Sequence, residues 1–468
     1  MILLAHSYYL AHDPKQHARM KPYPPLSTLL AAALLRERGH EVALFDAMLA
    51  PGVEAFEAML EATRPTIVGI LEDNFNYLTK MCTVRNREAT VRMIDAARER
   101  GCRVAVNGSD ATDRPALYLA AGADAVILGE GELGMLELAE LWSRDANAPL
   151  DVISGLALAA GSGAVRKTGP RQTVRDLDEL PFPAWDLVDA DAYRRAWTGA
   201  HGRFSWNMVT SRGCPYGCNW CAKPIFGRRY DQRSPARVAE EMRRLKDTVA
   251  PDHVWFADDI FGLTPEWIRA FAGEVDLRGA RTPFMMQSRV NLMRPGVVEA
   301  LARAGAEEVW LGVESGSQKV LDAMEKGTRV EAVRGATRAL QAAGIRACWF
   351  IQLGYPGEGW DELLMTRDLV RDARPDDIGV SVAYPLPGTG FYDRVRAQLG
   401  TRQNWEDSDD LAVLFQGAYG TAFYRRVRDA LHREVNTGSQ DDARWAELAL
   451  EAAAHRSAGA VELAAAGV

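Results

Sequence analysis

The sequence has no disulfide framework, no basic block and no apolar run long enough to cross a membrane. Only six cysteines occur in 468 residues, and three of them fall within eight consecutive positions, which excludes a disulfide-stabilised secreted scaffold. The formal net charge of −8, without a Lys/Arg-rich stretch, gives a nucleic acid no electrostatic support. The longest apolar stretches, such as 26–35, are far shorter than the ~20 residues of a membrane span. We therefore expect a small-molecule or peptide substrate.

The first residues also lack the basic segment and the small-residue cleavage site of a signal peptide. We interpret residues 1–5 as a first strand and expect a cytoplasmic protein. Apolar residues make up 47% of the chain and charged residues 25%, the balance of an ordinary globular protein. The length predicts two or three domains.

Residues 1–143 alternate short apolar runs with amphipathic helices. This pattern predicts an α/β fold, with a Rossmann-like five-stranded parallel sheet covered by helices on both faces. The strands are expected at 1–5, 42–45, 67–70, 103–106 and 125–128. Ligands of such sheets sit beyond the carboxyl ends of the strands. One pocket is therefore expected to be lined by the loops at 12–17, 72–77, 108–112 and 129–132.

The rest of the chain predicts three further regions. Gly- and Pro-containing segments over 144–195 predict a linker. Residues 196–393 predict a partial (β/α)6 barrel, and residues 394–468 a small helical C-terminal region. The barrel strands are expected at 206–211, 253–256, 283–287, 309–313, 347–353 and 378–383. The pairs Ser234-Pro235 and Thr264-Pro265 are typical of helix starts.

Cys214, Cys218 and Cys221 form a CxxxCxxC segment in the loop after the first barrel strand. Active sites assemble in the loops at that end of a barrel. A four-iron cluster held by three thiolates keeps one iron open, whereas structural zinc or a closed cluster needs a fourth protein ligand. A closed site would require a distant ligand such as Cys348 or His201, and this alternative stays open.

With Trp220 directly before its last cysteine, this segment resembles the signature of the radical S-adenosylmethionine (SAM) superfamily. The resemblance covers about 206–392. It implies that the three cysteines hold a [4Fe–4S] cluster, whose open iron binds SAM and whose electron cleaves SAM to a 5′-deoxyadenosyl radical. By the same resemblance, SAM contacts are assigned to Trp220, Ala257, Asp258, Asp259, Gly312, Glu314, Ser315, Gly354 and Pro356. At 257–259, alanine and aspartates replace the Gly-Gly-Glu pattern usual in the family.

Residues 1–143 resemble the cobalamin-binding domain that precedes the barrel in one large radical SAM class. That class includes carbon and phosphorus methylases and the anaerobic porphyrin ring cyclase. The resemblance, strongest at 22–26, 39–42 and 129–132, assigns cobalamin contacts to Asn74, Tyr77, Gly108, Ser109, Gly129, Glu130, Gly131 and Glu132.

The Asp-x-His-x-x-Gly motif of cobalamin domains that ligate cobalt through histidine is missing. His12, Asp13 and His17 are spaced differently, so we expect Asn74 and Tyr77 to pack under the corrin instead. The alternative is that this domain serves only as a scaffold.

The resemblance leaves two reactions open, and it identifies no catalytic residue. Methylation of an unactivated carbon in a small molecule is favoured by class frequency, and radical cyclisation, rearrangement or oxidation is the alternative. Methylthio transfer to RNA and a cobalamin carrier are lower alternatives. The family also implies a reductant such as flavodoxin or ferredoxin. Five C-terminal aromatic side chains are candidates for the substrate pocket, although a core role is more common for such residues: Trp405, Phe415, Tyr419, Phe423 and Tyr424.

Overall fold

The computed structural model describes residues 1–81, 83–222, 225–401 and 404–465, so Cys82 lies outside the described part. The chain forms two compact units, each discontinuous in sequence. The first comprises Met1–Pro215, Lys223–Asp259 and Asn404–Asp410, and the second comprises Tyr216–Ala222, Ile260–Gln403 and Leu411–Val468.

The large sheet of the first unit confirms the five predicted parallel strands and adds two more. The strands follow the order β2 Val42–Phe45, β1 Ile2–Ala5, β3 Ile67–Leu71, β4 Arg103–Asn107, β5 Ala125–Ile127, β6 Leu156–Ala160 and β7 Ala164–Lys167. Ile2 stands opposite Val42 on one side and Ile67 on the other, with both pairings parallel. β6 and β7 are antiparallel. The predicted linker 144–195 is therefore partly sheet.

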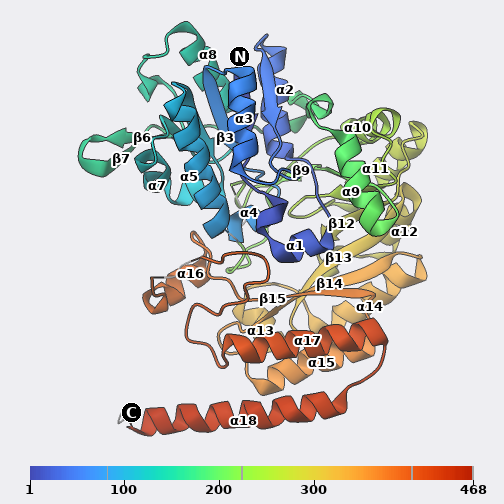
Figure 1. The fold of residues 1–468 in the computed structure, drawn as a ribbon. Helices are drawn as coiled ribbons and strands as arrows, with labels where there is room; N and C mark the ends of the chain where they lie inside the picture. Colours follow the sequence, from blue (N-terminus) through green and yellow to red (C-terminus); the bar gives the residue numbers. More distant parts are fainter. Residues whose placement is uncertain (82, 223–224, 402–403, 466–468) are drawn as a thin grey trace. The chain divides into compact units, whose positions relative to one another are not determined.

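Helices cover both faces of this sheet (Figure 1). One face carries α2 Leu26–Glu37 and α8 Glu132–Arg144, and the other carries α3 Val53–Thr63, α5 Thr83–Glu99 and α7 Pro115–Ala120. Phe45, Phe56, Met93 and Tyr118 belong to one apolar core between the strands and the second set of helices. Burial on both faces explains why β1 and β3 read as continuous apolar runs. Three short helices near the carboxyl ends of the strands are α1 Pro14–Arg19, α4 Leu78–Met81 and α6 Ser109–Asp113.

Two strands of the partial barrel lie in the first unit. β8 Ser205–Met208 and β11 His253–Phe256 pair in parallel, and α9 Ala190–His201 precedes them. The predicted strand 206–211 is divided, because β9 Ser211–Arg212 leaves β8 to form an antiparallel ribbon with β10 Asp231–Gln232. α10 Pro235–Thr248 begins as predicted, with the Ser234 hydroxyl accepting from the Arg237 amide at 3.2 Å.

The other four barrel strands lie in the second unit. They pair in parallel in the order β12 Phe284–Ser288, β13 Ala306–Glu314, β14 Arg346–Leu353 and β15 Asp377–Val382. The helices between and before them are α11 Pro265–Leu277, α12 Pro295–Ala304, α13 Gln318–Ala323, α14 Val330–Ala342 and α15 Trp360–Ala373. The Thr264 hydroxyl caps α11, as predicted, by accepting from the Trp267 amide at 3.3 Å.

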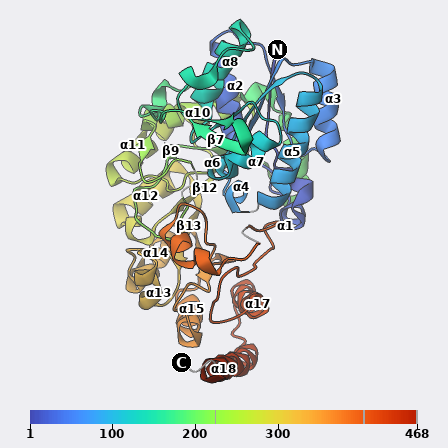
Figure 2. The same cartoon turned by 90° about the vertical axis from the view of Figure 1, so that its left-hand side faces the viewer.

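The C-terminal part is helical, as predicted, with α16 Gly390–Val395, α17 Thr421–Thr437 and α18 Asp442–Ala465. α17 and α18 run side by side in both views (Figures 1 and 2). All five aromatic pocket candidates are buried. The Phe415 ring lies 5.3 Å from that of Phe391 in an apolar cluster of this unit. The core interpretation of these aromatics is therefore the correct one.

The segment Asn404–Asp410 belongs to the first unit. The carboxylate of Asp13, which caps α1, accepts from the Ser408 amide at 3.1 Å and from its hydroxyl at 2.8 Å. The side chain of Asp13 is thus engaged in capping and in holding this segment. Across the described residues, no helix combines the length and apolarity that crossing a membrane requires.

Candidate functional site

The backbone before the first cysteine is fixed within the first unit. Gly213 adopts a left-handed conformation with φ +79°, and a Cβ there would clash with the carbonyl oxygen of Arg229. The Cys214 amide donates to the Gly227 carbonyl at 3.3 Å. A glycine is required here because the backbone packs closely against the segment that leads into β10.

The backbone around the other two cysteines is fixed within the second unit. The Asn219 amide donates to the Met324 carbonyl at 3.1 Å, and its side chain donates to the Ala323 carbonyl at 2.9 Å. The Tyr355 hydroxyl donates to the Asn219 side-chain oxygen at 2.6 Å. Cys218 is buried, and Nη1 of Arg289 lies 3.3 Å from its sulfur.

These contacts hold the cysteine segment without showing ligation. Among the residues the structure describes, no three His, Cys, Asp or Glu side chains are arranged to hold a metal ion. The assignment of Cys214, Cys218 and Cys221 as cluster ligands therefore stays a prediction that the resemblance implies.

Trp220 and Lys326 meet in the second unit. The indole N–H of Trp220 is buried with no acceptor in the described structure, and the Lys326 ammonium lies 5.7 Å from the centre of its ring. A buried donor without a partner costs about 1–3 kcal/mol. This donor is therefore suited to a polar group of a ligand.

Glu314, a predicted SAM contact, forms a buried ion pair at the end of β13. Its Oε1 lies 2.6 Å from the Lys326 ammonium, and its backbone has a left-handed φ of +67°. Such strain in a residue other than glycine costs about 1–3 kcal/mol and gathers at functional sites. A Cβ at Gly312 would lie 2.5 Å from the same ammonium. Ser315, by contrast, serves the local turn, because its hydroxyl accepts from the Ser317 amide at 3.1 Å.

The Gly354 turn after β14 rests on a buried acid. Gly354 has a φ of +79°, and a Cβ there would lie 3.0 Å from Cζ of Tyr424. Its amide donates to Oε2 of Glu358 at 2.5 Å. Burial raises the pKa of Glu358 to about 8, so this side chain is mostly protonated at neutral pH. Pro356 of the same turn is exposed.

Asp258, another predicted SAM contact, lies in the first unit. Its Oδ1 accepts from the Thr210 amide and hydroxyl, both at 2.9 Å, and from the Ser211 hydroxyl at 2.5 Å. Burial raises the pKa of Asp258 to about 6. One of its oxygens is therefore occupied in fixing the end of β8. The neighbouring Ala257 is buried, whereas Asp259 is exposed.

The carboxyl ends of β3 and β4 carry the predicted cobalamin contacts Asn74 and Ser109 and, beside them, Glu72, and all three side chains have a buried polar atom without a partner in the described structure. These atoms are Oε2 of Glu72, Oδ1 of Asn74 and Oγ of Ser109. Burial raises the pKa of Glu72. Polar atoms of this kind, at the edge where such sheets bind ligands, fit the amide groups of a corrin. Tyr77 of the same loop is 38% exposed.

The four residues from Gly129 to Glu132, also predicted to contact cobalamin, behave differently from one another. The Glu130 and Glu132 carboxylates hold the Arg212 guanidinium at 2.6 Å and 2.7 Å. Arg229 also pairs with Glu130. Since both carboxylates are engaged in ion pairs, the groups of this segment that remain for a cobalamin contact are the backbone atoms of its glycines. Gly129 has a φ of +76° with no atom within 4 Å of an added Cβ, whereas a Cβ at Gly131 would clash with Asn107.

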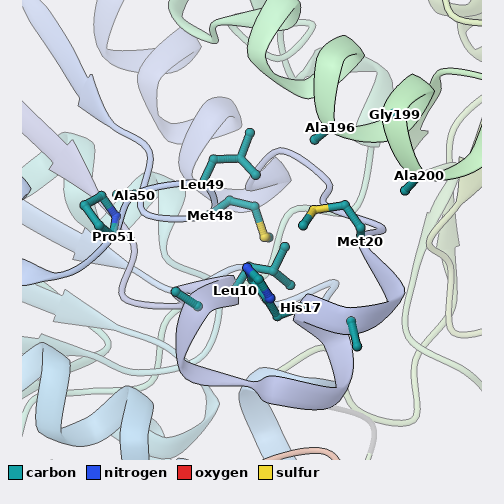
Figure 3. Close-up of a pocket in the computed structure, with 12 residues that line it drawn as sticks. Leu10, His17, Met20, Met48, Leu49, Ala50, Pro51, Ala196, Gly199 and Ala200 are labelled. Atoms are coloured by element: carbon teal, nitrogen blue, oxygen red, sulfur yellow. The ribbon is translucent and has the colours of Figure 1, made fainter.

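Three of the four loops predicted to line one pocket lie together, because the Gly129 amide donates to the Thr112 hydroxyl at 3.3 Å and a Cβ at Gly108 would lie 2.8 Å from the Glu72 side chain. A cavity of about 670 Å³ in the first unit is bordered by Leu10, His17, Met20 and Met48, with α9 along one side (Figure 3). It is largely apolar, and His17 is its one titratable side chain. A second cavity, of about 390 Å³, includes Gly129 and Glu130. Each of these two cavities contains residues of one predicted loop.

Sequence reasoning missed three charged residues at these sites. Arg212, Arg289 and Lys326 are all buried, and each contacts a predicted site residue. No spacing motif marks them: the partners of Arg212 and Arg289 lie 82 and 71 residues away, and Glu314 lies 12 residues before Lys326, across the end of a strand and a helix. The available signal was a single cation directly after an apolar strand, as at Arg289 following β12.

Comparison with known proteins identifies both parts of the chain. The Radical SAM superfamily model matches residues 208–370, and the B12 binding domain model matches residues 20–139. These matches confirm the predicted cofactors, namely SAM with a [4Fe–4S] cluster, and cobalamin.

Relatives with similar sequences span most of the chain. A protein of Pyrococcus horikoshii described as an uncharacterized methyltransferase is 28% identical over 424 residues, covering 86% of this chain and 88% of the relative. The hopanoid C-3 methylase of Methylococcus capsulatus is 27% identical over 388 residues, covering 81% and 70%.

A solved structure shows the same fold. It is that of the radical S-adenosylmethionine methyltransferase TsrM from Kitasatospora setae, with tryptophan substrate and a SAM analogue bound. The two chains share 20% identity with a TM-score of 0.70, over 86% of this chain and 77% of that one.

Proposed function

The chain belongs to the radical SAM superfamily and carries a B12-binding domain ahead of its radical SAM domain, and from this premise we propose that it is a cobalamin-dependent methyltransferase. Its substrate is a small molecule methylated at an unactivated carbon. The observation that carries the proposal is the presence of both domains in one chain, with the CxxxCxxC segment inside the radical SAM match.

The cluster ligands in this proposal are Cys214, Cys218 and Cys221. The donor set suits the group, because three thiolates leave one iron for SAM. The backbone supports it on both sides, through the turn at Gly213 and the hydrogen bonds of Asn219. When bound, the cluster with SAM supplies a radical and cobalamin supplies the methyl group.

The SAM contacts in this proposal come from the residues around the ends of β13 and β14. Trp220 offers a buried indole N–H, and the Glu314 and Lys326 pair offers charges of both signs. Glu358 keeps the Gly354 turn in place. Asp258 acts through the backbone that it fixes.

The cobalamin contacts in this proposal lie at the carboxyl edge of β3 and β4. The unpartnered oxygens of Asn74 and Ser109 would accept hydrogen bonds from corrin amides, and Gly108 and Gly129 allow close backbone approach. Tyr77 is the exposed member of the pair expected under the corrin. The side-chain amide nitrogen of Asn74 already donates to Asn107 at 3.0 Å, so the oxygen of Asn74 is the atom left for the corrin.

Methyl transfer is favoured over cyclisation by the two relatives reported above, which cover 86% and 81% of this chain and are described as a methyltransferase and a methylase. We further propose a cytoplasmic protein that receives electrons from a flavodoxin or ferredoxin. The apolar aromatics at the C-terminus are core residues, so the substrate pocket is not assigned to them.

The first test is cofactor loading. Anaerobically reconstituted protein should hold about four irons per chain and should cleave SAM to 5′-deoxyadenosine on reduction. Cys218→Ala should abolish both, whereas Cys102→Ala, at a buried thiol outside the motif, should retain both. Zinc in place of iron, or iron retained by Cys218→Ala, would contradict the assignment.

The second test separates the two reactions. Protein loaded with hydroxocobalamin should show base-off absorbance. A cell extract incubated with the protein and methyl-deuterated SAM should yield a product three mass units heavier than the product formed with unlabelled SAM. A product that forms without the label would support cyclisation or oxidation. Protein that never binds cobalamin would support the scaffold alternative.

A further inference from the structure

Arg289 is a buried cation that directly faces a predicted cluster ligand. It follows β12 in the second unit and is 5% exposed. Its Nη1 lies 3.3 Å from the sulfur of Cys218. Its guanidinium stacks 3.9 Å from the centre of the Tyr216 ring, within the same segment. Arginine remains positively charged in proteins, so a positive charge is held against this sulfur.

Among the residues that the structure describes, no carboxylate forms an ion pair with Arg289. Its other acceptors are neutral: the Lys326 carbonyl, the Thr328 hydroxyl at 3.5 Å and the Asn291 side-chain oxygen at 3.3 Å. Burying a cation without a counter-charge is costly. Lys326, the neighbouring buried cation, shows the usual solution, with Glu314 at 2.6 Å.

Holding the segment in place does not require this charge. Asn219, next to Cys218, is already fixed by hydrogen bonds to the Met324 and Ala323 carbonyls, the Tyr355 hydroxyl and, at 3.2 Å, the Glu325 carboxylate. A purely structural contact to Cys218 could equally be made by an uncharged donor. The position of Arg289 therefore points to an anionic partner, and the atom that its Nη1 faces at 3.3 Å is the Cys218 sulfur, which would carry negative charge as a ligating thiolate.

We propose that Arg289 is a positioning residue that donates an N–H to the Cys218 sulfur of the cluster and stabilises the reduced cluster by its positive charge. This inference rests on the proposed function. Hydrogen bonds to cluster sulfurs and nearby charge both set the reduction potential of an iron–sulfur centre. A fixed cation favours the form with the extra electron, so it raises the potential and makes one-electron reduction easier.

The test is the midpoint potential of the reconstituted cluster, measured without SAM by redox titration with electron paramagnetic resonance. Arg289→Met should shift the potential to a more negative value. Arg289→Lys keeps the charge but loses the planar donor fork, so its potential should fall between those of Arg289→Met and the wild type. Arg294→Met, at an exposed arginine five residues along the chain, is the matched control and should leave the potential unchanged.

The outcomes separate this inference from the function on which it rests. Wild-type protein that takes up no four-iron cluster refutes the proposed function. Arg289→Met with a full cluster at the wild-type potential overturns the role of Arg289 while leaving the function standing. A wild-type potential combined with weakened SAM binding would also overturn it, and would make Arg289 a SAM residue. If Arg289→Met takes up no iron, the uncharged donor variant Arg289→Gln decides, and a wild-type potential there overturns the inference.

Discussion

Arg212→Met is predicted to destabilise the first unit by several kcal/mol. Arg212 is 2% exposed and bridges Glu130 and Glu132 at 2.6 Å and 2.7 Å. Methionine fills a similar volume without the charge. Glu130 would keep its ion pair with Arg229. Glu132 would lose Arg212, its only cationic partner among the described ion pairs. The variant thus leaves one buried carboxylate uncompensated.

The magnitude follows from that orphaned charge. Removing one partner of a buried ion pair costs about 3–5 kcal/mol, whereas replacing both partners by apolar residues is often neutral. The double variant Arg212→Met/Glu132→Met should therefore recover most of the loss. The two residues should show a coupling energy of about 2–3 kcal/mol, near the upper end of values for contacting residues.

Urea unfolding of the cofactor-free protein, followed by circular dichroism, measures these free energies when the m value is unchanged. Arg98→Met is the control, because Arg98 is half-exposed and its pair with Asp124 at 3.2 Å lies at the surface. Its loss should stay within about 1 kcal/mol. Equal losses for Arg212→Met and Arg98→Met, or a double variant as unstable as the single one, would refute the reasoning.

Three further outcomes follow from the second unit. Because the pKa of Glu358 is raised from 4.5 to about 8, the folded chain keeps a proton that the unfolded chain loses, so stability falls as pH rises from 4.5 to 8; Glu358→Gln should remove this slope in melting curves recorded from pH 5 to 9. Glu314→Gln leaves the Lys326 ammonium buried without its counter-charge and should cost about 3 kcal/mol in urea unfolding. Gly354→Ala places a Cβ 3.0 Å from the Tyr424 ring at φ +79° and should lower the melting temperature, with a cost of at least about 1 kcal/mol.

The elements best predicted from the sequence are those with local causes. The bounds of β2 and β11 coincide with the predicted ranges 42–45 and 253–256, because apolar runs ended by polar loops mark buried strands. The caps at Ser234 and Thr264 also form as predicted, since a hydroxyl two or three residues before a free amide acts within one turn.

The elements that were missed depend on partners distant in sequence. β6 and β7 pair antiparallel within a glycine-rich stretch, and only the open edge of β5 supplies the reason for strands there. Glu130 was assigned to cobalamin by resemblance, but its carboxylate meets Arg212, which lies 82 residues further along the chain. The cysteine motif itself was readable from spacing, whereas the cation beside Cys218 depends on tertiary packing.

The segment Asn404–Asp410 has a consequence for biosynthesis. Asp13 binds Ser408, which lies 395 residues further along the chain, so the first unit contains residues that are synthesised long after its sheet. Domains usually fold in order as they emerge from the ribosome, but the first unit cannot be completed before residues 404–410 have been synthesised. A nascent chain that stops short of residue 408 lacks the partner that secures α1, so the first unit is completed only after residues 260–403 of the second unit have been synthesised.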